Sequence, residues 1–377
     1  MKFGTKLIHN GYAVDKTTGA LSIPIYQAST FHQEDVDRHQ EFEYGRSGNP
    51  TRKALEESMA FIEGGDRAFA FSSGMAAVSA VMSIFSAGDH IILCKDIYGG
   101  SYRIASKHFT QFGFEITFVD ETELAEIEAA VKPNTKAIFL ETPSNPLMKI
   151  TDLKGVSAIA KKHNLITVID NTFMSPYLQR PFESGIDIVL YSATKFIGGH
   201  SDVVGGVVVT SKKEHSSKIH AVQNNFGAVL GPFDCWLLMR GLKTLKLRMD
   251  YQQKSAEKLA EWLSTHPKVK QVFYPGLASH KGREIHFSQA SGGGAVLSFE
   301  ADSEETVKKF LKNIKMAVVA VSLGGVETIV SYPVKMSHAA IPEEERLKLG
   351  ITPKLVRVSL GVEEIEDLIE DFEKALK

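Results

Sequence analysis

The chain contains the segment Tyr191-Ser192-Ala193-Thr194-Lys195-Phe196-Ile197-Gly198-Gly199-His200, which begins where an apolar β-type run over 187–191 ends. Two hydroxyl side chains precede the lysine within three residues, and glycines follow it. A lone lysine is usually a solvated surface charge. However, a lysine amine can form a Schiff base with an aldehyde, and neighbouring hydroxyls can bind a phosphate. The segment therefore predicts a site for pyridoxal phosphate, a cofactor that carries both groups.

β-type runs and helical patterns alternate on both sides of this segment. Strands are expected at 68–71, 90–93, 115–119, 137–141, 167–170, 187–191 and 206–210, with helices at 75–86, 122–131 and 153–163. Such alternation is typical of an α/β fold with a mostly parallel sheet and helices on both of its faces. A ligand of this fold binds beyond the carboxyl ends of the strands.

The pattern changes from about residue 250, where a smaller α+β domain is expected. Its elements are a charged helix at 253–265, strands near 272 and at 295–300, a helix at 304–313 and an acidic helix from 364. The first 45 or so residues are rich in turns and show little periodicity. We therefore expect an N-terminal arm over 1–48, a large cofactor-binding domain over 49–241 and a C-terminal domain over 242–377.

Composition narrows the class of ligand. The 377 residues include 43 Lys and Arg against 45 Asp and Glu, so the charge of −2 gives no reason to expect a nucleic acid or membrane partner. The apolar runs fall far short of the roughly 18 residues that span a bilayer, and the first ten residues do not look like a signal peptide. We therefore expect a cytoplasmic protein with a small-molecule ligand.

Motifs of other enzyme classes are missing. Cys94 and Cys235 are both expected to be buried and are too few for a zinc cluster, so no metal site is expected. The sequence also lacks the GxGxxG, P-loop, HExxH and GxSxG motifs.

The strand ends supply candidates for the rest of a pyridoxal-phosphate site. Asp170 ends its strand and could keep the pyridine nitrogen protonated, or it could cap a helix or a turn. The turn at Ser73-Gly74 joins a strand to a helix, where the backbone can bind a phosphate. Tyr98 could cover the cofactor ring or be an ordinary buried tyrosine. Arg357, in an apolar strand, could bind the carboxylate of an amino-acid substrate.

Together these segments resemble the transsulfuration group of pyridoxal-phosphate enzymes, over essentially the full length of the chain. The group comprises cystathionine γ-synthases, cystathionine β- and γ-lyases and methionine γ-lyases. The matching segments, in the family's order, are Tyr44-Gly45-Arg46-Ser47-Gly48-Asn49-Pro50-Thr51-Arg52, Ser73-Gly74-Met75, Tyr98-Gly99-Gly100, Glu141-Thr142-Pro143-Ser144-Asn145-Pro146, Asp170-Asn171-Thr172-Phe173, Ser192-Ala193-Thr194-Lys195, Ser322-Leu323-Gly324 and Arg357. The resemblance implies an aspartate-aminotransferase-like fold (fold type I).

The resemblance also implies a role for each matching residue. Lys195 would carry the Schiff base, Asp170 would hold the pyridinium, and Tyr98 would stack on the cofactor and could assist proton transfer. The other cofactor-binding residues would be Gly74, Met75, Thr172, Ser192 and Thr194, with Tyr44 and Arg46 reaching the phosphate of the neighbouring subunit. The substrate would be held by Asn145, Ser322 and Arg357, with Val321 beside them. Sites shared in this way imply a dimer, and two dimers would form a homotetramer.

Val321 bears on the reaction that the resemblance implies. The γ-synthases and γ-lyases that resemble this chain generally carry a glutamate there. Methionine γ-lyases can also have valine there, but they typically carry a cysteine where this chain has Gly100. The stretches 29–33, 234–236 and 320–340 look most like cystathionine β-lyases of the Bacillus type. The implied reaction is β-elimination of L-cystathionine to homocysteine, pyruvate and ammonia, a step of methionine and cysteine metabolism. Alternatives are a cystathionine γ-lyase, a γ-synthase, an O-acylhomoserine sulfhydrylase or a non-catalytic pyridoxal-phosphate-binding regulator.

Overall fold

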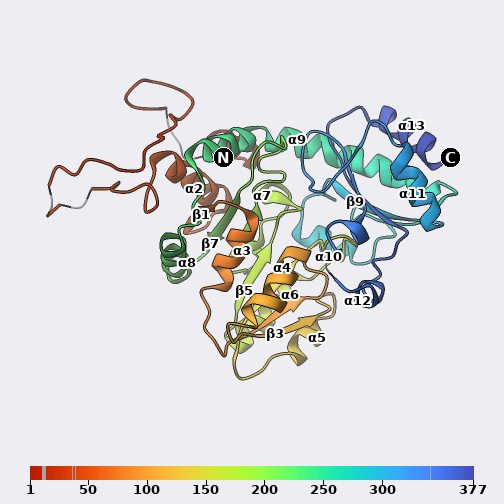
Figure 1. Cartoon of the computed structure of the whole chain (residues 1–377), viewed down its shortest axis with the longest axis horizontal. Coiled ribbons are helices and arrows are strands. Elements are labelled where there is room, and N and C mark those ends of the chain that lie inside the picture. The colour runs from red at the N-terminus through yellow and green to blue at the C-terminus, as the bar shows by residue number, and fades with distance from the viewer. Residues whose placement is uncertain (11–13, 36, 39, 340) are drawn as a thin grey trace.

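Two β-sheets, each covered by helices, make up the body of the protein (Figure 1). The computed structural model describes residues 1–10, 14–35, 37–38, 40–339 and 341–377. Ala340, the last residue of the 320–340 stretch, lies outside the described residues, as do five residues of the expected arm.

The larger sheet contains the seven expected strands in the order β1-β7-β6-β5-β4-β2-β3. Their bounds are β1 Arg67–Phe71, β2 His90–Cys94, β3 Glu115–Val119, β4 Thr135–Glu141, β5 Ile166–Asp170, β6 Ile188–Ser192 and β7 Gly206–Thr210. All pairs from β6 to β3 are parallel, and β7 runs antiparallel to both of its neighbours. The predicted α/β fold with a mostly parallel sheet is confirmed.

Helices cover both faces of this sheet, which explains why its inner strands are mostly apolar. Strands β2 and β7 bury every residue, and each buried Ile or Leu side chain contributes roughly 1.5–3 kcal/mol. Cys94 and Cys235 are buried free thiols, as expected. The helices of this part are α1 Phe3–Ile8, α2 Pro50–Glu63, α3 Gly74–Met82, α4 Gly99–Arg103, η1 Ile104–Phe109, α5 Leu124–Ala129, α6 Leu153–His163, α7 Ser175–Leu178, η2 Pro181–Ser184 and α8 Lys213–Phe226.

Helix α3 ends about one turn before its predicted end at residue 86. The hydroxyls of Ser79 and Ser83 donate to carbonyl oxygens four residues earlier, at 2.8 and 2.7 Å. Such back-bonding competes with the helical hydrogen bonds of the backbone. The helix stops at Met82, and a turn leads into β2.

Helix α9, Pro232–Thr265, is much longer than the predicted 253–265. Gly241 lies in the interior of this helix, where glycine is otherwise unfavourable. A larger residue would not fit at this position. A Cβ atom there would come within 2.3 Å of the Ile197 carbonyl oxygen and 2.5 Å of that of Gly198. The glycine thus lets α9 pack directly against the segment that follows Lys195.

The second sheet has five strands in the order β10-β11-β12-β9-β8 and carries its own buried core. Its elements are β8 Val269–Phe273, α10 Arg283–Gln289, β9 Val296–Ala301, α11 Glu304–Asn313, β10 Val318–Val319, β11 Ile329–Ser331, η3 Pro333–Lys335, α12 Glu343–Lys348, β12 Leu355–Ser359 and α13 Ile365–Leu376. The expected smaller α+β part is therefore present. The boundary between 241 and 242 stays a prediction, and α9 runs through it without a break.

The N-terminal part projects from the body of the protein. Between α1 and α2 the described residues form no helix and no strand longer than the single bridge Thr30–Tyr44. Figure 1 shows this segment as an extended loop beyond α2 and α8. Among the described residues, no helix has the length and apolar character needed to cross a membrane.

Candidate active site

A cavity of about 450 Å³ lies at the carboxyl ends of the parallel strands and reaches the second sheet. Twelve of the fourteen site residues expected from the sequence line it. These are Gly74, Met75, Tyr98, Asn145, Asp170, Thr172, Ser192, Thr194, Lys195, Val321, Ser322 and Arg357. The fold therefore collects side chains that are up to 283 positions apart in the sequence, counted from Gly74 to Arg357.

Tyr44 and Arg46 are the two expected residues that do not line the cavity. The Arg46 guanidinium lies 5.6 Å from the centroid of the Tyr44 ring, and its Nη1 donates to Asn224 Oδ1 at 3.1 Å. Tyr44 is half exposed. Both side chains thus lie at the base of the projecting segment and outside their own chain's cavity.

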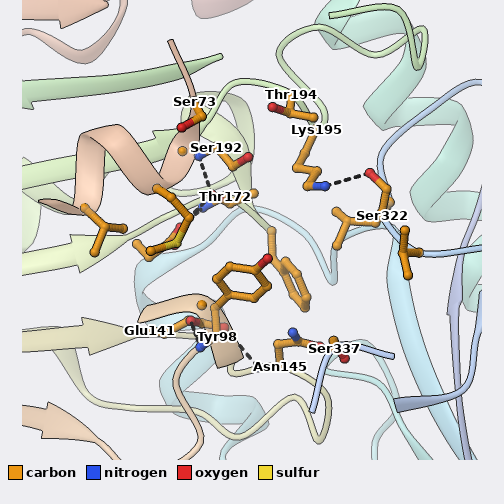
Figure 2. A pocket seen from close by; sticks show the side chains of 18 of the residues that line it. Ser73, Tyr98, Glu141, Asn145, Thr172, Ser192, Thr194, Lys195, Ser322 and Ser337 are labelled. Carbon is orange, nitrogen blue, oxygen red and sulfur yellow. Dashed lines mark hydrogen bonds between the residues drawn. The ribbon is translucent and has the colours of Figure 1, made fainter. Parts of the chain in front are cut away.

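Lys195 lies in a tight turn just beyond the end of β6. Its backbone N–H donates to Ser192 O at 3.1 Å, and its Nζ donates to Ser322 Oγ at 2.6 Å (Figure 2). Burial, reinforced by the nearby positive charge of Arg357, lowers the pKa of Lys195 to about 8, although Asp170 opposes the shift. A lysine with this pKa is neutral far more often near neutral pH than an ordinary lysine, and the neutral amine can act as a nucleophile or a base.

Asp170 ends β5, which pairs in parallel with β6. Its Oδ1 accepts hydrogen bonds from Thr172 N at 3.0 Å and Thr172 Oγ1 at 2.5 Å, so the alternative that it caps a turn is also correct. Thr172 Oγ1 in turn accepts the backbone N–H of Ser192 at 2.8 Å. Burial raises the pKa of Asp170, whereas the hydrogen bonds from Thr172 and the charge of Lys195 lower it. The carboxyl group thus bounds the cavity in a fixed orientation.

The N-terminus of α3 forms another wall of the cavity. Ser73 caps the helix through a 3.0 Å hydrogen bond from Ala76 N, while the first N–H groups of a helix have no partner within it. A Cβ on Gly74 would come within 2.9 Å of the Ser192 side chain. Only glycine therefore lets α3 approach the end of β6 so closely, and the result is a concave site suited to a phosphate.

Tyr98 precedes α4 and faces the cavity in Figure 2. The residue is 42% exposed, so the alternative that it is an ordinary buried tyrosine is wrong. Its ring is free to cover a flat ligand.

Arg357, on β12, lies at the side of the cavity formed by the second sheet. Its guanidinium donates to Asn145 Oδ1 at 3.0 Å, Ser322 O at 2.7 Å and Ser331 Oγ at 3.1 Å. It is 3% exposed, and its buried Nε has no hydrogen-bond partner in the described part of the chain. Because every acceptor around it is neutral, its charge can be balanced by the carboxylate of a ligand.

Ser322 connects Arg357 to the lysine, since its carbonyl accepts from the arginine and its hydroxyl accepts from Lys195. The residue has φ = 86°, a conformation that non-glycine residues seldom adopt. Val321, directly before it, lines the cavity and is 65% exposed, so the valine does not pack into the core.

Several lining residues were not among those expected from the sequence. The most buried of the charged ones is Glu141, which ends β4 and lies opposite Asp170 in the register of β4 and β5. The rule that identified Asp170, a carboxylate at the end of a strand, would also have found it. Others are Ser73, Val78, Arg103, Phe173, Val204, Ser331, Met336 and Ser337.

Comparison with known proteins agrees with this geometry. The chain is 54% identical to "Cystathionine beta-lyase MetC" of Bacillus subtilis over 99% of its own length and 96% of the relative's. It is also 52% identical to "Cystathionine gamma-lyase" of the same organism over the full length of both. A crystal structure of cystathionine γ-lyase from Lactobacillus plantarum with L-serine superposes with a TM-score of 0.97 at 46% identity, covering 100% of this chain and 98% of the other.

The sequence profile of one family, described as Cys/Met metabolism PLP-dependent enzyme, matches residues 4–377. That match spans both sheets and every residue that lines the cavity. The chain therefore belongs to the Cys/Met metabolism family of pyridoxal-phosphate-dependent enzymes.

Proposed function

We propose that the protein is a carbon–sulfur lyase that cleaves the Cβ–S bond of L-cystathionine and releases homocysteine, pyruvate and ammonia. The observation that carries the choice of bond is Val321, an exposed neutral side chain beside Ser322 at the cavity wall. Because this residue is a valine, its side chain supplies no carboxylate at the cavity wall that could assist chemistry at Cγ. Four similar proteins named cystathionine β-lyase, 51–54% identical over 99% of this chain, support the same choice.

The cavity fits pyridoxal phosphate through groups already in place. The concave N-terminus of α3, with Ser192 and Thr194, would hold the phosphate. Asp170 would hold the ring nitrogen, Tyr98 would cover the ring, and Lys195 would bind the aldehyde. When bound, the cofactor withdraws electrons from the substrate Cα.

The chain's own residues would do the rest. Arg357 and Asn145 would bind the substrate α-carboxylate and so fix the direction of the Cα–H bond. Lys195, with its lowered pKa, would take the Cα proton. Ser322 would hold the amine of Lys195 near that proton through the observed 2.6 Å hydrogen bond.

A second candidate is a cystathionine γ-lyase, favoured by the 52% identity to the B. subtilis protein of that name. The keto acid formed from L-cystathionine separates the two, because Cβ–S cleavage gives pyruvate and Cγ–S cleavage gives 2-oxobutyrate. Both acids can be measured by chromatography after incubation with the purified holoenzyme. Predominant 2-oxobutyrate would overturn the proposed β-lyase activity.

We expect Val321→Glu to shift the products of L-cystathionine toward 2-oxobutyrate, by about tenfold in the product ratio, and to lower the total rate. The new carboxylate supplies the missing charge at the cavity wall but must itself be desolvated or paired. Val204→Glu is a matched control, since Val204 is another exposed valine of the same cavity. An unchanged ratio in Val321→Glu, or an equal shift in both variants, would show that Val321 does not determine the reaction.

The projecting N-terminal segment supports a site completed by a second subunit. Tyr44 and Arg46 lie outside their own cavity, which is consistent with the role that the family resemblance implies for them at the phosphate site of a neighbouring chain in a dimer. We extend the proposal to a homotetramer built from two such dimers. The arm boundary at residue 48 and the cytoplasmic location likewise remain predictions from the sequence.

Mixing inactive variants tests the shared site. We expect Arg46→Ala and Lys195→Ala subunits to recover up to about a quarter of wild-type activity after exchange, because half of the dimers would be hybrids with one intact site each. Mixing Lys195→Ala with Asp170→Asn should recover nothing, since both residues belong to one chain's cavity. No recovery in the first mixture, once mass spectrometry confirms subunit exchange, would contradict a shared site.

A further inference from the structure

Among the described residues that line the cavity, Glu141 is the one buried carboxylate that the proposed mechanism does not use. It is the last residue of β4 and lies opposite Asp170 in the sheet register. The residue is 5% exposed, so its carboxylate is held almost entirely by the protein.

Its two carboxylate oxygens bind backbone groups from two different segments. Oε2 accepts the N–H of Tyr98 at 2.8 Å, and Oε1 accepts the N–H of Asn145 at 3.2 Å (Figure 2). Asn145 then accepts from Arg357 through its side chain. Glu141 therefore holds the backbone of two residues of the cavity: Tyr98, which carries the aromatic ring, and Asn145, whose side chain binds Arg357.

We propose that Glu141 is a positioning residue that fixes Tyr98 and Asn145 relative to each other, so that cofactor retention and binding of the substrate carboxylate depend on one side chain. The inference rests on the proposed function for the ligands of Tyr98 and Asn145. It does not depend on which carbon–sulfur bond is cleaved.

The chemistry of the carboxylate explains why a glutamate is needed. An ionised carboxylate can accept an N–H at each oxygen, whereas an amide has one acceptor oxygen and an NH2 group that would face the second N–H. Glutamine would therefore leave one buried N–H without an acceptor at nearly unchanged volume. Burial and Asp170 raise the pKa of Glu141, and the hydrogen bonds from Tyr98 and Asn145 oppose that shift.

The experiment compares Glu141→Gln with two other variants in the holoenzyme. Glu56→Gln is a control for loss of a largely buried carboxylate outside the cavity: Glu56 Oε1 accepts both the backbone N–H of Ala70 at 2.8 Å and Gln223 Nε2 at 3.0 Å, so glutamine can keep both bonds. Asn145→Ala removes only the group next to Arg357.

Two quantities are measured for each variant: the dissociation constant of pyridoxal phosphate and the dissociation constant of glycine. Both are followed by the absorbance of the bound cofactor. Glycine is suitable because it has a carboxylate and an amine but no Cβ leaving group.

We expect Glu141→Gln to weaken both equilibria by at least about tenfold. Asn145→Ala should weaken glycine binding alone, and Glu56→Gln should change neither by more than about twofold. If Glu141→Gln changes only one constant, or if Glu56→Gln weakens both to the same extent, Glu141 does not couple the two functions. Should Glu141→Gln fail to fold, Glu141→Asp keeps the charge but is too short to reach both N–H groups, and the same paired loss is expected. A product other than pyruvate would refute the β-lyase proposal and leave this result unaffected.

Discussion

Lys195→Ala is expected to lower kcat/KM for L-cystathionine by at least about 10⁴-fold, because one amine both binds the cofactor aldehyde and takes the Cα proton. The holoenzyme is expected to be yellow, because the Schiff base between Lys195 and the cofactor absorbs visible light, and the variant should lose this absorbance. Borohydride reduction followed by mass spectrometry provides a readout independent of turnover: the wild type should gain the mass of the reduced cofactor on the peptide containing Lys195, and the variant should not.

Lys195→Arg serves as the control for charge. Arginine keeps a cation beside Asp170 and Ser322 but cannot supply a neutral amine near neutral pH. We expect it to be as inactive as Lys195→Ala while retaining cofactor better. Covalent trapping of the cofactor in either variant would refute the assignment of Lys195.

Asp170→Asn is expected to lower kcat/KM by about 10³-fold while the protein stays folded. An ion pair between Asp170 and the cofactor nitrogen at about 4 Å is worth roughly 4 kcal/mol at an effective dielectric constant of 20, which corresponds to that factor. Asparagine keeps an oxygen that can accept both hydrogen bonds from Thr172, so the local turn survives. Kinetics and the pH titration of the cofactor absorbance measure the effect.

Asp187→Asn is a matched control for this change. Asp187 likewise accepts from the N–H and the hydroxyl of one threonine, Thr167, at 3.1 and 3.0 Å, but it lies outside the cavity. Because Asp187 also pairs with Lys212 at 2.6 Å, its replacement is expected to lower stability modestly, without a comparable loss of kcat/KM. Equal kinetic losses in both variants would mean that Asp170 acts only through local structure.

Local sequence patterns predicted the buried strands, because strands inside an ordinary apolar core have a typical sequence pattern. The buried strands could be found from apolar runs between turn residues, and Lys195 and Asp170 from their places at strand ends. Helix α9 extends well beyond the predicted 253–265, and the glycine inside it, Gly241, is explained only by contact with a distant segment, the backbone at Ile197 and Gly198. A rule based on helix propensity treats such a glycine as unfavourable in a helix, because it takes no account of contacts with distant chain segments.

In the cavity, too, some features could be predicted from the local sequence and others depend on tertiary contacts. Glu141 ends β4 and is paired with Asp170 at the end of β5. However, no feature of the local sequence indicates that Glu141 binds the backbone of Tyr98 and Asn145. Those two segments are 47 positions apart, counted from residue 98 to residue 145, and approach each other only when β2 and β4 pair.

By itself, the sequence determined the fold class, because strand periodicity is a local property. Reactive side chains at strand ends pointed to the cofactor, and the resemblance of whole segments to transsulfuration enzymes indicated the family. The tertiary structure alone decided how the groups act on one another. It lowered the pKa of Lys195 to about 8 by burying the amine near Arg357, exposed Val321 at the cavity wall, and placed Glu141 between Tyr98 and Asn145. The physical reason is that burial, electrostatic interaction and hydrogen bonding depend on distances in space, which the order of residues along the chain does not specify.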